Sequence, residues 1–148
     1  MHFEVALEFS GDPAEVWRRA STIAEIPNYW HGTRSLSVLG ETNGVTRAKV
    51  KFAFGGSGEA EISAVEEGRI LTIDYKSGPF TGRQTVQVND GRAVAMWDVK
   101  FRGIYALTSK WSDRHFRTGT ARALERLVYG NRGREEAKSS ASRPTTNG

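Results

Sequence analysis

The chain has 148 residues, of which 38% are hydrophobic and 26% are charged, a size and composition typical of one folded domain and not of a disordered chain. Its formal net charge is +4 and it has no cysteine, which excludes a disulfide framework, a cysteine nucleophile and a thiolate metal site. No stretch approaches the roughly 18 consecutive apolar residues of a membrane span, and the first residues do not resemble a secretory signal, so we expect a cytoplasmic protein.

The start of the chain predicts one strand followed by two short helices. Residues 2–9 alternate apolar and polar side chains, which is typical of a half-buried strand. Asp12-Pro13-Ala14-Glu15 combines a capping residue, a proline at the first helical position and an early carboxylate, so we expect a helix to begin there. Its buried side should hold Val16, Trp17 and Ala20. Thr22 and Glu25 repeat the capping pair and predict a second short helix that Pro27 interrupts or ends.

Six further strands are predicted, each bounded by turn residues. They cover residues 34–40, 45–54, 59–66, 69–76, 83–89 and 93–102. The separators are short and rich in glycine and asparagine, as in Thr42-Asn43-Gly44 and Asn89-Asp90-Gly91. Connections this short join antiparallel neighbours. The glycine-rich segment 54–61 joins two strands and lacks a Gly-Lys-Ser/Thr ending, so we interpret it as a hairpin turn and not as a phosphate-binding loop.

A long amphipathic helix is predicted over about residues 110–130. One face of its helical wheel collects Phe116, Thr120, Ala123, Leu124 and Leu127. Residues 131–148 have no apolar periodicity and are expected to form a disordered basic and polar tail. The predicted fold class is therefore α+β: a single domain, residues 1–130, with a curved seven-stranded antiparallel sheet wrapped around the last helix.

This order of elements resembles the helix-grip, or START-like, superfamily, which groups polyketide cyclases, START lipid-transfer domains, the birch pollen allergen and coenzyme Q-binding proteins. Residues 5–39, VALEFSGDPAEVWRRASTIAEIPNYWHGTRSLSVL, are similar to the opening of that family. Residues 94–101 resemble its last strand and 111–128 its closing helix, and the Pro-Asn-Tyr-Trp turn resembles the branch that includes an accessory chain of carbon monoxide dehydrogenase. The resemblance implies a cavity between sheet and helix that holds lipids, quinones, polyketides or other apolar molecules.

We therefore expect a protein that binds a hydrophobic or amphipathic small molecule, without a cofactor. Small residues in the middle of the helix, opposite small residues of the sheet, indicate either close packing or empty space. The predicted ligand-binding residues are Trp30, Phe52, Phe54, Tyr75, Phe80, Trp97, Phe116, Thr120, Ala123 and Leu124. Tyr75, Trp97 and Thr120 would orient the ligand with their polar atoms. Phe80, in the glycine-rich loop SGPFTG, is predicted to gate the cavity.

Two alternatives remain open at this point. The first is an enzyme of the cyclase or aromatase type, with His31 as the acid–base residue. No catalytic residue is assigned, because the strand parity turns the carboxylates outward and the three histidines are scattered. The same scatter leads us to expect no metal site. The second alternative is an accessory protein that contacts a redox enzyme or a membrane.

Such contact would use an arginine-rich face of the last helix. Residues 100–134 hold nine basic and only two acidic side chains. The candidates are Arg114, Arg117, Arg122 and Arg126. Because no aromatic side chains interleave with them, we expect no specific contact with nucleic acid. Neither the ligand's identity nor the oligomeric state follows from the sequence.

Overall fold

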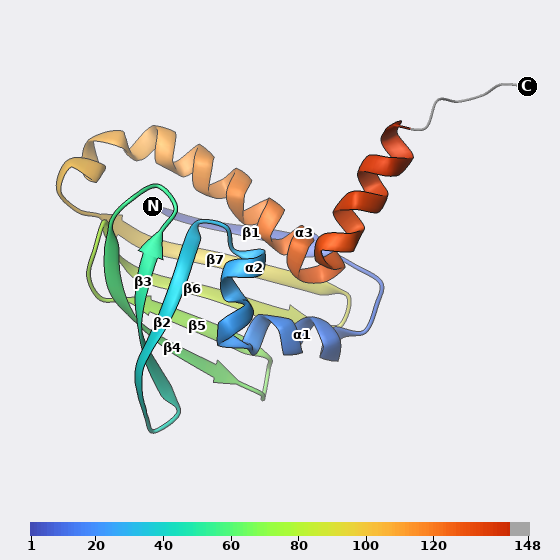
Figure 1. Cartoon of the computed structure of the whole chain (residues 1–148), viewed down its shortest axis with the longest axis horizontal. Helices are drawn as coiled ribbons and strands as arrows, with labels where there is room; N and C mark the ends of the chain where they lie inside the picture. Colours follow the sequence, from blue (N-terminus) through green and yellow to red (C-terminus); the bar gives the residue numbers. More distant parts are fainter. Residues whose placement is uncertain (143–148) are drawn as a thin grey trace, which may run out of the picture.

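The computed structural model describes the backbone of residues 1–142 and the side chains of residues 1–106 and 113–130. Seven antiparallel strands form one curved sheet, short helices follow the first strand, and a long helix ends the described chain (Figure 1). The predicted α+β architecture is therefore confirmed.

The sheet is built from β1 (His2–Glu8), β2 (Thr33–Thr42), β3 (Val45–Phe52), β4 (Ser57–Val65), β5 (Ile70–Tyr75), β6 (Phe80–Asn89) and β7 (Arg92–Phe101). Its strand order is β1-β7-β6-β5-β4-β3-β2, with antiparallel pairing throughout. Strands β2 to β7 pair in chain order through short turns, and the helices after β1 carry the chain to the opposite edge. The register of β2 shifts after Thr33 and again after Val38, and such bulges bend a strand.

Helix α1 (Pro13–Ser21) begins where the sequence predicts it. The Asp12 side chain accepts a hydrogen bond from the Ala14 amide at 3.0 Å, and the predicted residues are buried. The second helix differs from the prediction. After a 3₁₀ turn, η1 (Ile23–Glu25), helix α2 (Ile26–Tyr29) holds Pro27 in its first turn, where a missing N–H costs nothing. The Thr22 hydroxyl makes no capping bond and donates instead to the Arg18 carbonyl oxygen.

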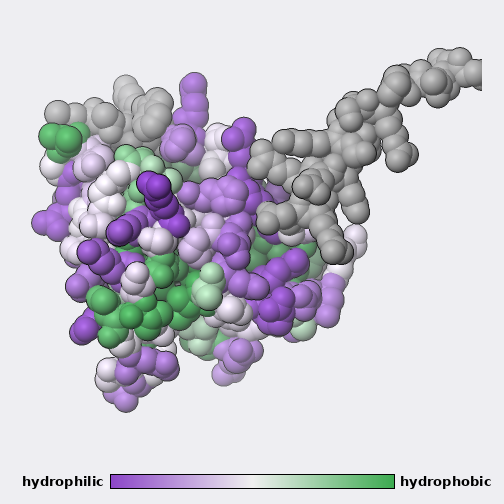
Figure 2. All heavy atoms as spheres, in the orientation of Figure 1, coloured by the Kyte–Doolittle hydropathy of each residue, from purple (hydrophilic) through white to green (hydrophobic). Residues whose placement is uncertain are grey.

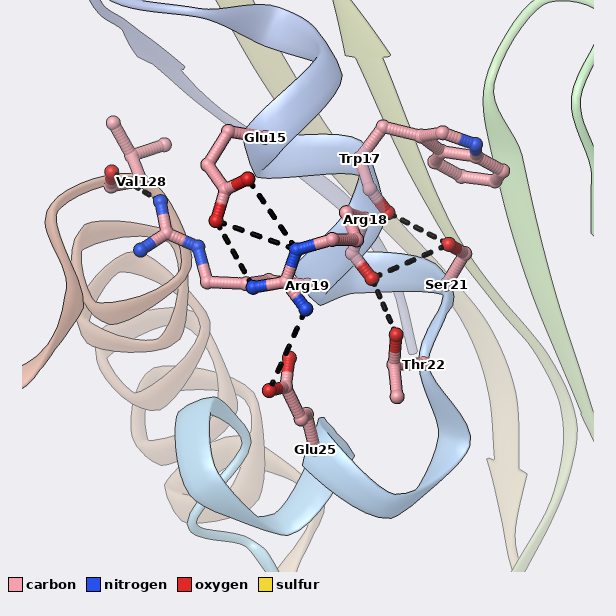
Figure 3. Close-up of polar contacts among 8 residues, drawn as sticks. All are labelled: Glu15, Trp17, Arg18, Arg19, Ser21, Thr22, Glu25 and Val128. Atoms are coloured by element: carbon pink, nitrogen blue, oxygen red, sulfur yellow. Dashed lines mark hydrogen bonds and ion pairs between the residues drawn. The ribbon is translucent and has the colours of Figure 1, made fainter.

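Helix α3 (Ser109–Ser142) follows a 3₁₀ segment, η2 (Gly103–Thr108), and lies along the sheet in Figure 1. It is broken at Gly130, whose φ of 68° and ψ of −179° are non-helical. The break falls where we expected the helix to end, but helical backbone resumes and continues to Ser142. At the break, Arg19 of α1 donates from Nη2 to the Val128 carbonyl oxygen at 2.9 Å (Figure 3). Residues 143–148 of the predicted tail lie outside the described residues.

The core lies between the concave face of the sheet and the buried sides of α1, α2 and α3. Most side chains that the strand parity assigned to the interior are buried or half-buried. Val38 is an exception, with 61% of its surface exposed: it keeps the inward register, opposite the buried Ala48, but lies on the edge strand β2. Apolar surface also shows over β2 and its neighbours in Figure 2, surrounded by hydrophilic residues. In the part of the chain that the structure describes, no helix is both long and apolar enough to cross a membrane.

Candidate ligand-binding cavity

A cavity of about 240 Å³ lies between the sheet, α3 and the two segments that follow α2 and β3. Its buried wall consists of Trp30, Thr33, Phe52, Tyr75, Phe80, Trp97 and Thr120. The other lining side chains are exposed or half-buried and include His31, Phe54, His115, Phe116 and Arg122. The cavity therefore runs from an aromatic interior to an open mouth along one flank of α3.

Trp97 is the centre of the aromatic interior. Its ring stacks on that of Tyr75, with centroids 5.9 Å apart and an angle of 7° between the planes. Trp30 and Phe116 each approach the same indole to 5.2 Å, and Phe80 approaches it edge-on at 5.9 Å. Edge-to-face and offset pairs are the favourable arrangements of aromatic rings. Because each ring packs against the Trp97 indole, these contacts hold the rings in place and make the inner wall apolar.

Three polar side chains of this wall have hydrogen-bond partners within the protein. The Trp97 indole N–H donates to Thr120 Oγ1 at 3.0 Å, and the Thr120 hydroxyl donates to the Phe116 carbonyl oxygen at 2.6 Å. The Tyr75 hydroxyl donates to Gln84 Oε1 at 2.7 Å. Burial raises the pKa of the Tyr75 phenol above its ordinary value, so this group stays neutral. The polar atoms of Tyr75, Trp97 and Thr120 therefore hold the side chains of the wall in place, whereas we had expected them to orient a ligand. Gln84 was missed at the sequence level, although it has the same strand parity as the buried Val86 and Val88.

The mouth follows a flank of α3 marked by His115, Gly119, Arg122 and Arg126, which are four, three and four residues apart. Gly119 forms the gap in this rim, because a Cβ atom built there meets nothing within 4 Å. Arg126 is held at the rim by a hydrogen bond from Nη1 to the Tyr29 carbonyl oxygen at 2.9 Å. Glycine thus leaves the entrance open, and the helix places cationic side chains beside it.

Most of the predicted ligand-binding residues meet at this cavity. Those that line it are Trp30, Phe52, Phe54, Tyr75, Phe80, Trp97, Phe116 and Thr120. Ala123 and Leu124 do not line it. Each is 1% exposed and packs into the hydrophobic core. Their contact with a ligand stays a prediction that the lining of this cavity does not support.

Two phenylalanines differ in position from the prediction. Phe80 is the first residue of β6, pairs in register with Phe101, and is 1% exposed, so it lies in the inner wall and not on a turn at the mouth. Phe54 was expected in a strand, but β3 ends at Phe52. The chain turns at Gly55 and Gly56, which both have positive φ. Phe54 is 40% exposed and is the aromatic side chain that lies at the rim.

The arginines of α3 do not share one face. Arg117 bonds Asp113 at 3.0 Å and lies over the Phe3 ring, 4.9 Å from its centroid. Arg122 and Arg126 line the cavity, whereas Arg114 is exposed and lies away from it. Contact with a membrane or a redox enzyme through these arginines stays a prediction.

Few groups in the cavity can take part in acid–base chemistry. Among the described residues, no group of three or more histidine, aspartate or glutamate side chains could hold a metal ion. Histidines 31 and 115 both line the mouth. His31 Nε2 lies 3.1 Å from the Asn28 carbonyl oxygen, which orients the imidazole.

No protein-family model matches this chain, and no curated protein matches it by sequence. Solved structures do match in fold. TTHA0849 from Thermus thermophilus has a TM-score of 0.72 at 18% identity, covering 97% of this chain and 100% of that one. A conserved protein from Geobacillus kaustophilus has a TM-score of 0.64 at 16% identity, and the match covers 94% of this chain and 97% of that one.

The Zhui aromatase/cyclase from a Streptomyces species has the same fold with a TM-score of 0.55. Its identity to this chain is 11%, and the match covers 86% of this chain and 95% of that one. At these identities the likeness shows a shared fold, and functions are not transferred by fold alone.

Proposed function

We propose that this protein binds an apolar or amphipathic small molecule in the cavity between its sheet and α3. The observation that carries the proposal is the buried, aromatic interior that opens to the surface at Gly119. An apolar pocket with a few polar groups at its edge is the usual form of a small-molecule site. The aromatase/cyclases among the structural neighbours support the same interpretation.

The size of the cavity bounds the ligand. Its volume of about 240 Å³ exceeds that of an engineered apolar cavity of about 150 Å³ that binds benzene. A two-ring aromatic part therefore fits. A probe of roughly a dozen heavy atoms, at about 0.5 kcal/mol each, would bind with a dissociation constant of tens of micromolar. Longer lipid or polyketide chains would place their remaining length outside the mouth.

The test uses naphthalene-2-carboxamide, a neutral two-ring probe, in calorimetric titrations of the whole chain. Gly119→Phe places a ring in the mouth, and the matched control Gly119→Ala adds one methyl group in open space. We expect the wild type and Gly119→Ala to bind the probe, and Gly119→Phe to bind it at least about tenfold more weakly. Absence of binding to the wild type, or equal binding to the folded Gly119→Phe variant, contradicts the proposal.

A second candidate is catalysis in the same cavity, of the cyclase or aromatase type. His31 supports it, because this imidazole lines the mouth and is oriented by Asn28. Replacement of His31 by Ala should then abolish turnover of a reactive polyketide chain and leave its binding unchanged. Equal product formation by His31→Ala and the wild type, followed by chromatography, would rule out this role.

A further inference from the structure

The charges that line the cavity are all of one sign. Two guanidinium groups, Arg122 and Arg126, lie at the mouth beside two imidazoles. Among the described residues that line the cavity, none is an aspartate or a glutamate. The mouth therefore concentrates positive charge at the entrance to an aromatic interior, although residues 1–99 carry more acidic than basic side chains.

Among the described residues, no charged side chain belongs to the buried wall of the cavity. Its rings are apolar, and the polar atoms of Tyr75, Trp97 and Thr120 already have protein partners. Burying a carboxylate among such groups without a partner costs several kcal/mol. A charged group on a bound ligand is therefore stable only at the mouth.

The arginines are placed to meet such a group. Arg126 is held at the mouth by its bond to the Tyr29 carbonyl oxygen and adds positive charge there. Arg122 lies one helical turn before it on the same flank and is exposed to incoming ligand. Planar guanidinium groups bind carboxylates through paired, charge-assisted hydrogen bonds.

We infer that the ligand is an aromatic or apolar acid, whose ring system fills the cavity and whose carboxylate binds Arg122 at the mouth, in the positive field that Arg126 strengthens. This inference rests on the proposed function, because it specifies the chemistry of a ligand in that same cavity. It also fixes the orientation of the ligand, with the acid group toward solvent.

The test compares two probes of the same shape, naphthalene-2-carboxylate and its neutral amide, in calorimetric titrations. The wild type should bind the carboxylate on the order of tenfold more tightly than the amide, and added salt should reduce that difference. Arg122→Gln should remove most of the preference for the carboxylate over the amide. Arg114→Gln, the same charge change away from the cavity on the same helix, should retain the preference.

The outcomes separate the two proposals. Equal binding of both probes, or the same loss in Arg114→Gln as in Arg122→Gln, overturns the acid inference and leaves the cavity proposal standing. Failure of both probes to bind the wild type overturns both proposals. Thermal unfolding of each variant checks its fold, and both replaced side chains are exposed.

Discussion

The hydrogen bond between Trp97 and Thr120 ties α3 to the sheet at the inner wall of the cavity, and its removal should destabilise the protein measurably. Both side chains are 1% exposed, and the indole N–H donates to the hydroxyl at 3.0 Å. Thr120→Val keeps the shape and the β-branching of the side chain, so its helix propensity hardly changes. The variant leaves a buried indole N–H without its acceptor, which costs about 2 kcal/mol.

Two controls isolate this bond. Thr120→Ser keeps the hydroxyl and loses one methyl group, which should cost about 0.8 kcal/mol. In a Trp97→Phe background the indole donor is absent, so Thr120→Val should cost less than about 0.5 kcal/mol. The free energy of unfolding of all four proteins of the cycle can be measured by urea denaturation followed by circular dichroism. An equal cost of Thr120→Val in both backgrounds would refute the reasoning, because the bond would then contribute nothing.

Three further predictions concern stability. Gly130→Ala should lower the free energy of unfolding by about 1–3 kcal/mol in chemical denaturation, because φ of 68° with ψ of −179° is a conformation nearly confined to glycine; an unchanged value would contradict the break in α3. Gly119→Ala should instead raise the free energy of unfolding by about 0.5–1 kcal/mol, because alanine favours a helix and the new methyl group meets open space. A loss of stability would show that other atoms fill the mouth of the cavity. Burial raises the pKa of both Tyr29 and Tyr75. The native state therefore keeps phenol protons that the unfolded chain loses above about pH 10. Above that pH the free energy of unfolding should fall by about 1.4 kcal/mol per pH unit for each phenol. Tyr75→Phe should reduce that slope in denaturation curves between pH 9 and about 11, and a slope equal to that of the wild type would contradict the buried phenol.

The sequence was most informative where one local rule decides the structure. The alternation in each strand identified most inward side chains, because a half-buried antiparallel strand allows only one assignment of its faces. The alternation also predicted that Phe52, Tyr75 and Trp97 face the interior, and all three line the cavity. The alternation does not show how far a side chain is covered: Val38 has the inward register, opposite Ala48, but is exposed on the edge strand β2.

The positions that could not be predicted depend on tertiary contacts. Phe54 and Phe80 exchanged their expected places because the end of β3 and the start of β6 depend on turn geometry around them. The mouth could not be located either. A helical wheel places Arg122 and Arg126 on one flank of α3, but it does not show which neighbouring segment faces that flank or that a gap remains at Gly119.

The most direct test of ligand binding in this cavity is a nuclear magnetic resonance titration of the tryptophan indole N–H signals with naphthalene-2-carboxamide. Trp30 and Trp97 line the cavity, whereas the indole of Trp17 lies elsewhere and bonds Glu66 Oε2 at 2.8 Å. We expect the Trp30 and Trp97 signals to shift in a saturable manner and the Trp17 signal to stay in place. A shift of Trp17 equal to those of Trp30 and Trp97, or no shift of any of the three at saturating probe, would contradict ligand binding in this cavity.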